Sequence, residues 1–409
     1  MTRLVLPLIA SLASAWAQSP EALLRDPTVQ AAFAAAERNE AHVLNEQARL
    51  CEIPAPPFKE ELRGRELVRL FKELGLKDVQ VDKAGNVIGV RPGNEPHPNL
   101  VFSAHLDTVF PEGTDVHVKR EGTSLRGPGI GDDCRGLAVM LGVIHALNEA
   151  HVRTPGAITF VADTGEEGLG DLRGMKQLFG DTLKGRVDSF VSVDGTGLGI
   201  TNLGVGSLRY RVTFKGPGGH SYGAFGMANP IQAMGRAMAK IDDFQVPTTP
   251  RTTFNVGRVG GGTSVNAIPF EAWMEVDLRS ADKAALTALN DKFKAALNDA
   301  VNEENKRWNG RGAVSVAPEL VGIRPAGETA NSSHIVQTAI AVSKALGIAE
   351  VLQEGSSDSN VPMNIGIPAI TVSGGGQGSG AHSLGEAFDS KGSLQGTQRA
   401  ILLAIALAR

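Results

Sequence analysis

Hydrophobic residues in the first half of the chain alternate between two patterns. Short runs of consecutive apolar residues, typical of buried strands, are separated by stretches in which apolar residues recur every three or four positions, as in helices. The strand-like runs are residues 79–81, 87–90, 100–104, 158–162 and 189–193, and the helical stretches are residues 27–50, 59–74 and 137–147. Strands that alternate with helices predict an α/β fold with a mostly parallel sheet.

The pattern changes after Gly204. Strand-like segments now lie at residues 208–214, 252–259 and 272–278, with helical segments at residues 230–241 and 284–301. These predict a small α+β sandwich. From about residue 321 the first pattern returns, with helices at residues 333–346 and 394–407 and a strand at residues 369–372. We therefore predict an α/β domain in two pieces, residues 18–203 and 321–409, with residues 204–320 inserted as a second domain.

The N-terminal segment has the features of an export signal. An uncharged apolar run extends from Leu4 to Ala17 after Arg3 and ends in the small-residue pattern Ala15-Trp16-Ala17. The run is short for a membrane span, and it has no polar face to support the alternative of an amphipathic first helix. We expect residues 1–17 to be a cleaved signal peptide. The mature protein is then secreted or periplasmic, with no membrane partner.

Composition narrows the choice of partners and of cysteine chemistry. The chain has 40 Lys+Arg against 44 Asp+Glu, a net charge of -4, which does not favour a nucleic-acid partner. Its 2 cysteines allow one disulfide at most. We expect Cys51 to be a free buried thiol. A Cys51–Cys134 bridge in an oxidising compartment and metal ligation by Cys134 remain open alternatives.

Polar residues of five motifs carry the candidate chemistry, and most of them follow predicted strands. The motifs contain His105 with Asp107, Asp132 in a glycine-rich segment, Glu166 with Glu167, Asp194, and His382 near the end of the chain. Taken singly, each has an ordinary explanation, such as a loop hydrogen bond, a helix N-cap or a solvated acidic turn. Ligands of open α/β sheets bind at the carboxyl ends of the strands. Together these nitrogen and oxygen donors suit zinc, and two ions that share a carboxylate would use all of them.

On these motifs the chain resembles the co-catalytic dizinc exopeptidases and deacylases. That family includes peptidase T, glutamate carboxypeptidase, acetylornithine deacetylase and succinyl-diaminopimelate desuccinylase. The resemblance extends over nearly the whole mature chain and implies a zinc-exopeptidase catalytic domain with an inserted lid or dimerisation domain. It implies two Zn²⁺ ions, for which Co²⁺ or Mn²⁺ can substitute. One ion is then bound by His105, Asp132 and Asp194, and the other by Asp132, Glu167 and His382.

The resemblance also implies roles for residues beside the metals. Glu166 matches the general base that takes a proton from the attacking water and returns it to the leaving amine. Asp107 matches the residue that orients His105. An unusual cis peptide bond is expected between Asp132 and Asp133.

The inserted segment carries three further motifs of the family. Gly218-Gly-His220-Ser resembles a turn whose histidine reaches across a homodimer to polarise the scissile carbonyl. The resemblance also implies substrate contacts for Asn266, in the loop 263–269, and for Arg279, which without it would be interpreted as a surface charge. Gly375, in the run 374–376, would belong to a loop that binds the substrate carboxylate.

We therefore expect an exopeptidase that hydrolyses short peptides, with aminopeptidase activity of the peptidase T kind. Asp at position 194 is typical of aminopeptidase-like members, and the segment 356–360 points the same way. The export signal departs from peptidase T, which is cytoplasmic. The closest alternative is an N-acyl-amino-acid deacylase or carboxypeptidase with the same site. A non-catalytic binding protein that keeps the fold is an alternative of another class.

Overall fold

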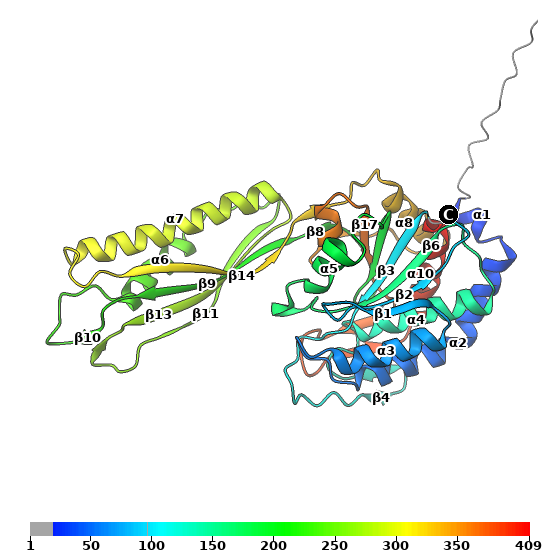
Figure 1. The fold of residues 1–409 in the computed structure, drawn as a ribbon, viewed down its shortest axis with the longest axis horizontal. Helices are drawn as coiled ribbons and strands as arrows, with labels where there is room; N and C mark the ends of the chain where they lie inside the picture. The colour runs from blue at the N-terminus through cyan, green and yellow to red at the C-terminus, as the bar shows by residue number, and fades with distance from the viewer. Residues whose placement is uncertain (1–18, 96) are drawn as a thin grey trace, which may run out of the picture.

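The computed structural model describes residues 19–95 and 97–409, and Figure 1 shows a large α/β domain from which an elongated second domain projects. The predicted signal peptide, residues 1–17, lies outside the described residues. In the part of the chain that the structure describes, no helix combines the length and the hydrophobicity that a membrane span requires.

The α/β domain is built on a nine-stranded sheet. Its strands are β1 (Lys77–Val81), β2 (Val87–Arg91), β3 (Asn99–His105), β6 (Ala157–Asp163), β7 (Ser189–Val193), β8 (Ile200–Gly204), β15 (Gly327–Glu328), β16 (Leu352–Gly355) and β17 (Ala369–Val372). The order is β1-β2-β6-β3-β7-β17-β8-β15, with β16 also paired to β8. The four central strands β6, β3, β7 and β17 are mutually parallel, and antiparallel pairs flank them. The sheet is therefore mixed and mostly parallel, which confirms the predicted fold class.

Helices cover both faces of this sheet (Figure 1). They are α1 (Pro20–Leu23), α2 (Pro27–Cys51), α3 (Glu61–Glu73), α4 (Cys134–Glu149), α5 (Arg173–Gln177), α8 (His334–Ala345), α9 (Asn360–Asn364) and α10 (Ser393–Leu407). Alternate residues of β3 point to opposite faces. Leu100 and Phe102 belong to the core cluster that includes α2, α4 and α10, whereas Val101 belongs to the cluster under α5 and α9. This burial on both faces explains why the strand reads as a continuous apolar run.

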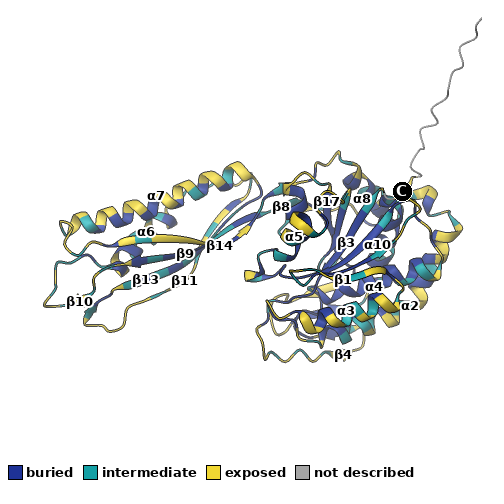
Figure 2. Cartoon of the chain, in the orientation of Figure 1, coloured by how far each residue is buried: buried dark blue, intermediate teal, exposed yellow. Residues whose placement is uncertain are grey.

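Local signals set the ends of the helices. Asp26 caps α2, because its Oδ1 accepts a hydrogen bond from the Thr28 amide at 2.8 Å, and Pro27 occupies the first helical position. Figure 2 shows that the outer surfaces of α2 and α3 are exposed while the central strands are buried. The predicted helix, residues 27–50, and the observed α2 begin at the same residue and differ by a single residue at the C-terminal end.

The elongated domain is a four-stranded antiparallel sheet with two helices on one face (Figure 1). Its strands are β9 (Gly206–Lys215), β11 (Thr252–Gly261), β13 (Glu271–Ser280) and β14 (Ser315–Arg324), in the order β11-β13-β9-β14, and its helices are α6 (Pro230–Asp242) and α7 (Lys283–Arg307). Buried and half-exposed residues alternate strictly along β13. β14, which the sequence pattern did not predict, runs across the expected domain boundary at residue 320.

The remaining elements are short. A four-stranded sheet beside the α/β domain contains β18 (Gln377–Ser379), β19 (Ala387–Asp389), β5 (Ser124–Arg126) and β4 (Lys119–Glu121). β10 (Gly219–His220) pairs with β12 (Ala267–Ile268) at the far end of the elongated domain (Figure 1). A 3-10 turn (Gly168–Gly170) precedes α5 and a π-helical turn (Leu178–Thr182) follows it.

The two cysteines form a disulfide, which corrects the expectation of a free thiol at Cys51. Cys51 is the last residue of α2 and Cys134 the first of α4, their Cα atoms are 5.5 Å apart, and both side chains are fully buried. The bond also excludes Cys134 as a thiolate ligand for a metal. Residues 83 positions apart in sequence meet here because α2 packs along α4, a contact that sequence spacing does not reveal.

Candidate metal centre and active site

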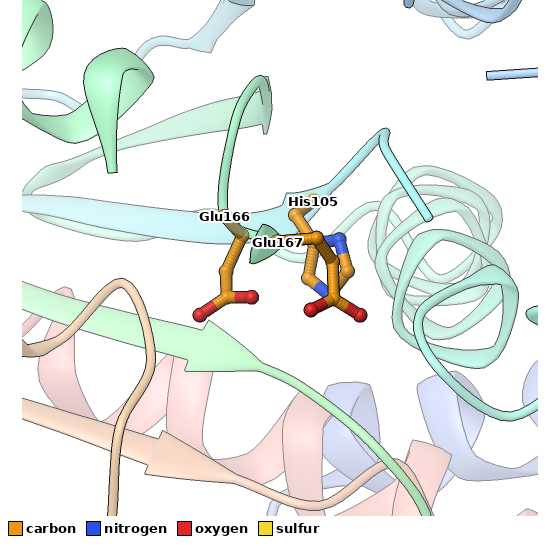
Figure 3. Close-up of side chains that lie close together, drawn as sticks. All are labelled: His105, Glu166 and Glu167. Atoms are coloured by element: carbon orange, nitrogen blue, oxygen red, sulfur yellow. The ribbon is translucent and has the colours of Figure 1, made fainter. Parts of the chain in front are cut away.

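The predicted site residues of the α/β domain gather at the carboxyl edge of its parallel strands. His105 is the last residue of β3, and Asp194 directly follows β7. Glu166 and Glu167 follow β6 after a two-residue turn. Figure 3 shows the two glutamates projecting from the same loop, with Glu167 against the imidazole of His105. Strand polarity therefore brings motifs that are far apart in sequence to one edge.

Two groups of side chains at this edge have the geometry of metal ligands. One contains His105, Asp132 and Asp194, and the other contains Asp132, Glu167 and His382, with the ligand atoms of each group within 4.8 Å of one another. These are the two sets that the family resemblance implies, and Asp132 belongs to both. A third group joins His105 to Glu166 and Glu167.

Asp132 lies between two histidines. Its Oδ1 is 3.1 Å from His105 Nε2, and its Oδ2 is 3.2 Å from His382 Nε2. His382 Nε2 is also 3.0 Å from Glu167 Oε1. Each carboxylate oxygen of Asp132 therefore faces a different group of candidate ligands, which is the arrangement that a bridging carboxylate requires.

The donor set fits divalent cations. Imidazole nitrogens and carboxylate oxygens are the ligands that zinc accepts when thiolates are absent. The carboxyl groups of Asp132, Asp194, Glu166 and Glu167 are crowded together, and burial with Asp132 nearby raises the pKa of Asp194 well above its usual value. Bound cations would offset this crowding of negative charge. The described residues of the site therefore offer both the ligand atoms and the negative charge that two metal ions require.

Two acidic residues without an assigned role hold the loop that contains Asp132. Asp133 caps α4 by accepting from the Gly136 amide at 2.9 Å, and it also accepts from the His105 amide at 3.1 Å. Glu386 accepts from the amides of Gly131 and Asp132, at 2.7 and 3.1 Å. The peptide bond between Asp132 and Asp133 is cis, as expected from the family. The N-cap interpretation of this segment is thus right for Asp133, while Asp132 faces the candidate metal centre.

Asp107, which the resemblance implies to orient His105, contacts that imidazole with its carbonyl and, at a longer distance, with its carboxylate. His105 Nδ1 is 3.0 Å from the main-chain oxygen of Asp107 but 3.7 Å from its carboxylate. The carboxylate also accepts hydrogen bonds from the amides of Gly165, Glu166 and Glu167, at 2.9, 3.1 and 2.8 Å. Asp107 therefore fixes the imidazole with its carbonyl and the glutamate loop with its side chain.

Glu166, the predicted base, is paired with an arginine that the sequence analysis did not identify. Arg324 Nη1 donates to Glu166 Oε1 at 2.9 Å, Arg324 Nη2 donates to the Glu166 carbonyl, and both side chains are 6% exposed. Burial raises the pKa of Glu166 to about 7, although Arg324 opposes this rise. Arg324 is the last residue of β14, a strand absent from the sequence prediction, so no local signal marked it.

Two predicted residues of the inserted domain lie away from this edge. His220 is in β10 and Asn266 precedes β12, at the distal end of the elongated domain (Figure 1). Both residues are exposed, and the Ser221 amide donates to the Asn266 carbonyl at 2.9 Å. Within a single chain of this conformation, the structure does not bring either residue to the candidate metal centre.

The other two predicted substrate contacts have different outcomes. Arg279 lines a cavity of about 280 Å³ between the domains, together with Arg251, Glu354 and Ser356, and its Nε donates to Asp277 at 2.6 Å. The Gly375 amide donates to the Gly197 carbonyl at 2.8 Å. That amide is therefore not free to bind a substrate carboxylate, because the loop 374–376 pairs with the turn around Gly197.

Two family models match this chain. The peptidase dimerisation domain matches residues 205–305, and the peptidase family M28 matches residues 86–217. The first covers most of the elongated domain, and the second covers the segment that carries four of the five ligand candidates. They confirm the resemblance to metallopeptidases that the motifs predicted.

Similar proteins and structures agree with these matches. The Bacillus subtilis protein YqjE is 28% identical over 360 residues, which is 82% of this chain and 91% of its own length. Carboxypeptidase G2 of Pseudomonas sp. is 28% identical over 246 residues, 57% of this chain and only 56% of its own length. The solved aminopeptidase PepT of Bacillus cereus superposes with a TM-score of 0.72 at 22% identity, covering 91% of this chain and 99% of its own.

A further solved structure has a similar fold. The Bacillus subtilis YXEP protein, described as a dinuclear metal-binding peptidase of the M20 family, has a TM-score of 0.68 at 18% identity and covers 90% of this chain and 98% of its own. At such identity the likeness shows a shared fold. With the family models and the geometry above, the chain is a hydrolase of the metallopeptidase kind that acts on peptide bonds.

Proposed function

We propose that this hydrolase is a dizinc exopeptidase that removes the N-terminal residue of short peptides. The observation that carries the proposal is the position of Asp132 between His105 and His382, beside the buried carboxyl group of Glu166. A shared carboxylate, two histidines and a neighbouring base are what metal-assisted hydrolysis of an amide requires.

The chain's own residues then divide the chemistry. Two bound zinc ions would supply the Lewis acidity that lowers the pKa of a water toward ~7 and polarises the scissile carbonyl. Glu166 accepts the proton of the attacking water and returns it to the amine that leaves, and a pKa near 7 suits both transfers. Asp107 accepts a hydrogen bond from the Glu166 amide, and Arg324 donates one to the Glu166 carboxylate. The base is therefore fixed before substrate binds. Preorganisation of this kind removes an orientation cost from the reaction.

Positive charge beside Glu166 supports a substrate with a free carboxylate. Arg209, Arg279 and Arg324 lie on neighbouring strands at the domain junction. Ser207 of β9 is paired with Arg279 of β13 and with Arg324 of β14, and Arg209 follows two residues later on β9. Asp277 compensates part of this charge through contacts to Arg279 and Arg209, at 2.6 and 3.7 Å. Arg279, which lines the cavity between the domains, would attract the C-terminal carboxylate of a short peptide or the carboxylate of an N-acyl amino acid.

The choice of aminopeptidase over the alternatives has two supports. In the first group of candidate ligands, position 194 carries Asp rather than Glu, which is typical of the aminopeptidase-like members of the family that the chain resembles. Solved neighbours include an aminopeptidase and a tripeptidase, the latter from Staphylococcus aureus with a TM-score of 0.73 at 22% identity, covering 90% of this chain and 98% of its own. The second candidate, carboxypeptidase or deacylase, is favoured by the names of relatives such as carboxypeptidase G2 and the N-acetylcysteine deacetylase of Bacillus subtilis.

The inserted domain is proposed to complete the site in a homodimer. His220 and Asn266 lie too far along the elongated domain to reach the metal centre of their own chain in this conformation (Figure 1). A second copy could present them, with His220 stabilising the oxyanion.

We also propose that the mature protein is exported, because the N-terminal apolar segment has the features of a signal peptide. The Cys51–Cys134 disulfide suits an oxidising compartment.

A hydrolysis panel on zinc-loaded mature protein tests this proposal. The substrates are Ala-Ala-Ala, N-acetyl-Ala-Ala-Ala, Ala-Ala-Ala amide and N-acetyl amino acids, each with and without a chelator. Cleavage of the free tripeptide alone, abolished by the chelator, is the expected result. Preference for the N-acetylated substrates would overturn the aminopeptidase assignment in favour of the deacylase or carboxypeptidase.

A further inference from the structure

The loop that carries Glu166 is held by the inserted domain as well as by its own. We call residues 165–171 the base loop, and we call Arg209, Ile323 and Arg324, where β9 and β14 meet the α/β domain, the lid root. β14 runs from the elongated domain back into the α/β domain at this place (Figure 1).

Each lid-root residue contacts the base loop. Arg324 donates to both the carboxylate and the carbonyl of Glu166, and Arg209 donates to the carbonyl of Gly168. The Ile323 amide donates to Asp171 Oδ1 at 2.7 Å. Hydrogen bonds therefore reach the loop at its start, middle and end, and all of them cross between the two domains.

Lys176 of α5 reinforces the contact with Asp171. Its Nζ donates to the Ile323 carbonyl at 2.8 Å and to Asp171 Oδ2 at 2.6 Å. Asp171 itself has a φ of 57°, a left-handed conformation that Asp and Asn adopt more readily than most residues. The backbone of this turn is thus shaped to present Asp171 to β14.

The α/β domain fastens the other side of the base loop. Asp107 accepts from three successive amides, and the Leu172 amide donates to the Gly165 carbonyl at 2.8 Å. Leu172 is fully buried in the core under α5. The loop is therefore fixed between two domains, and any rotation of the inserted domain must either carry the loop with it or break the lid-root contacts.

We propose that the lid root positions Glu166 for proton transfer, with Arg209 and Asp171 as positioning residues that do not contact the reacting atoms. This inference rests on the proposed function, because it takes Glu166 as the base. It assigns to the inserted domain a second task besides dimerisation, namely to set the place of the base loop relative to the metal ligands. Misplacement of a catalytic group by about 1 Å can cost on the order of 10²-fold in rate.

The test is the steady-state kinetics of Arg209→Ala and Asp171→Ala on the best substrate of the panel, with metal content and folding checked for each. We expect kcat to fall by about tenfold or more with KM within about threefold, since the loss is one of orientation. Asp171→Asn keeps the oxygen that accepts from Ile323 and should recover most of the activity. Arg211→Ala is the matched control, because Arg211 lies two residues along β9 and pairs with Glu275 inside the elongated domain at 2.7 Å.

Two results would overturn the inference. Wild-type kcat in both Arg209→Ala and Asp171→Ala would show that the lid root does not position the base. A rise in KM with unchanged kcat would make Arg209 a substrate contact instead. Glu166→Gln, measured in parallel, separates this failure from failure of the proposed function: if that variant stays active, Glu166 is not the base, whatever the lid-root variants do.

Discussion

Cys51, at the end of α2, is disulfide-bonded to Cys134, the second residue after Asp132. The bond ties the loop that presents the candidate bridging carboxylate to a helix at the start of the chain, and both cysteines are fully buried. It closes a loop of 83 residues, and a covalent loop of that size stabilises a fold chiefly by restricting the unfolded chain.

We expect the double variant Cys51→Ala/Cys134→Ala to be less stable than the wild type by about 3–5 kcal/mol. Urea unfolding of the α/β domain, followed by circular dichroism, measures the difference. A reducing agent should lower the stability of the wild type and leave that of the double variant unchanged. Equal stability of the two proteins under oxidising conditions would contradict the expectation.

Glu166→Gln should lower kcat by about 10²–10⁴-fold, because the amide cannot accept the proton of the attacking water. The amide keeps the size of the carboxyl group and can still accept a hydrogen bond from Arg324, so the fold and the metal content should persist. Peptide hydrolysis and metal analysis on the same sample check both points. Glu112→Gln, which changes an exposed carboxylate paired with Lys59, serves as the control and should retain wild-type activity.

Asp132→Asn should lose metal from both positions, since the two oxygens of Asp132 face different histidines. Asp194→Asn should lose only one ion, because Asp194 belongs to one of the two groups that contain Asp132. Metal stoichiometry after dialysis, by elemental analysis or calorimetric titration with Zn²⁺, distinguishes the two variants. Retention of two tightly bound ions by Asp132→Asn would exclude a bridging role.

Stability should fall as the pH rises through the titration of a buried carboxyl pair, Asp163 and Asp358. Burial raises the pKa of Asp163 to about 6, and burial together with Asp163 raises that of Asp358 well above its usual value. The folded state therefore keeps protons that unfolded aspartates, with a pKa of about 3.9, release. The free energy of unfolding should thus decrease from about pH 4 to pH 6 and beyond.

Asp358→Asn removes one member of the pair and should flatten this pH dependence. Urea unfolding at several pH values between about 4 and 8 measures it. Asp78→Asn, at an exposed position, should leave the slope of the wild type unchanged. An identical slope in Asp358→Asn and the wild type would refute the contribution of the pair.

Activity should be restored by mixing two inactive variants if His220 acts across a dimer. Loss of His220 should cost about 10²–10³-fold, as for other oxyanion donors. In a mixed dimer of His220→Ala and Glu166→Gln, one active site combines an intact base with the partner's intact histidine. Random reassociation should therefore recover about a quarter of wild-type activity, one site in four. No recovery, with mixed dimers verified by differential tagging, would show that His220 does not act in trans.

Local patterns were sufficient for the elements that carry the ligands. The run that forms β3 is buried on both faces and therefore reads as continuous apolar sequence up to His105. β7 and β17 were predicted with the limits that the structure shows, for the same reason. β14 was missed because most of its residues are exposed, so that no regular alternation of apolar and polar residues marks the strand, and because it contains Pro318.

Contacts between distant segments were outside the reach of sequence patterns. Arg324 and Glu166 are 158 positions apart, and Glu386 holds the Gly131 amide across 255 positions. The carboxylate of Asp107 accepts a hydrogen bond from the Gly165 amide, which lies 58 positions further along the chain. In each case the partner is a single polar group on another segment, and no periodicity in the sequence records where that segment will pack.

The sequence by itself therefore determined the alternation of strands and helices, the motifs at the strand ends and, through the family resemblance, the two sets of candidate ligands. These depend on burial and on residue type, which are local properties of the chain. Only the tertiary structure decided that the cysteines pair, that Asp107 holds the glutamate loop, that Arg324 holds the base, and that His220 lies far from its own metal centre. Those features depend on how two domains and distant segments pack, which is settled by the whole fold.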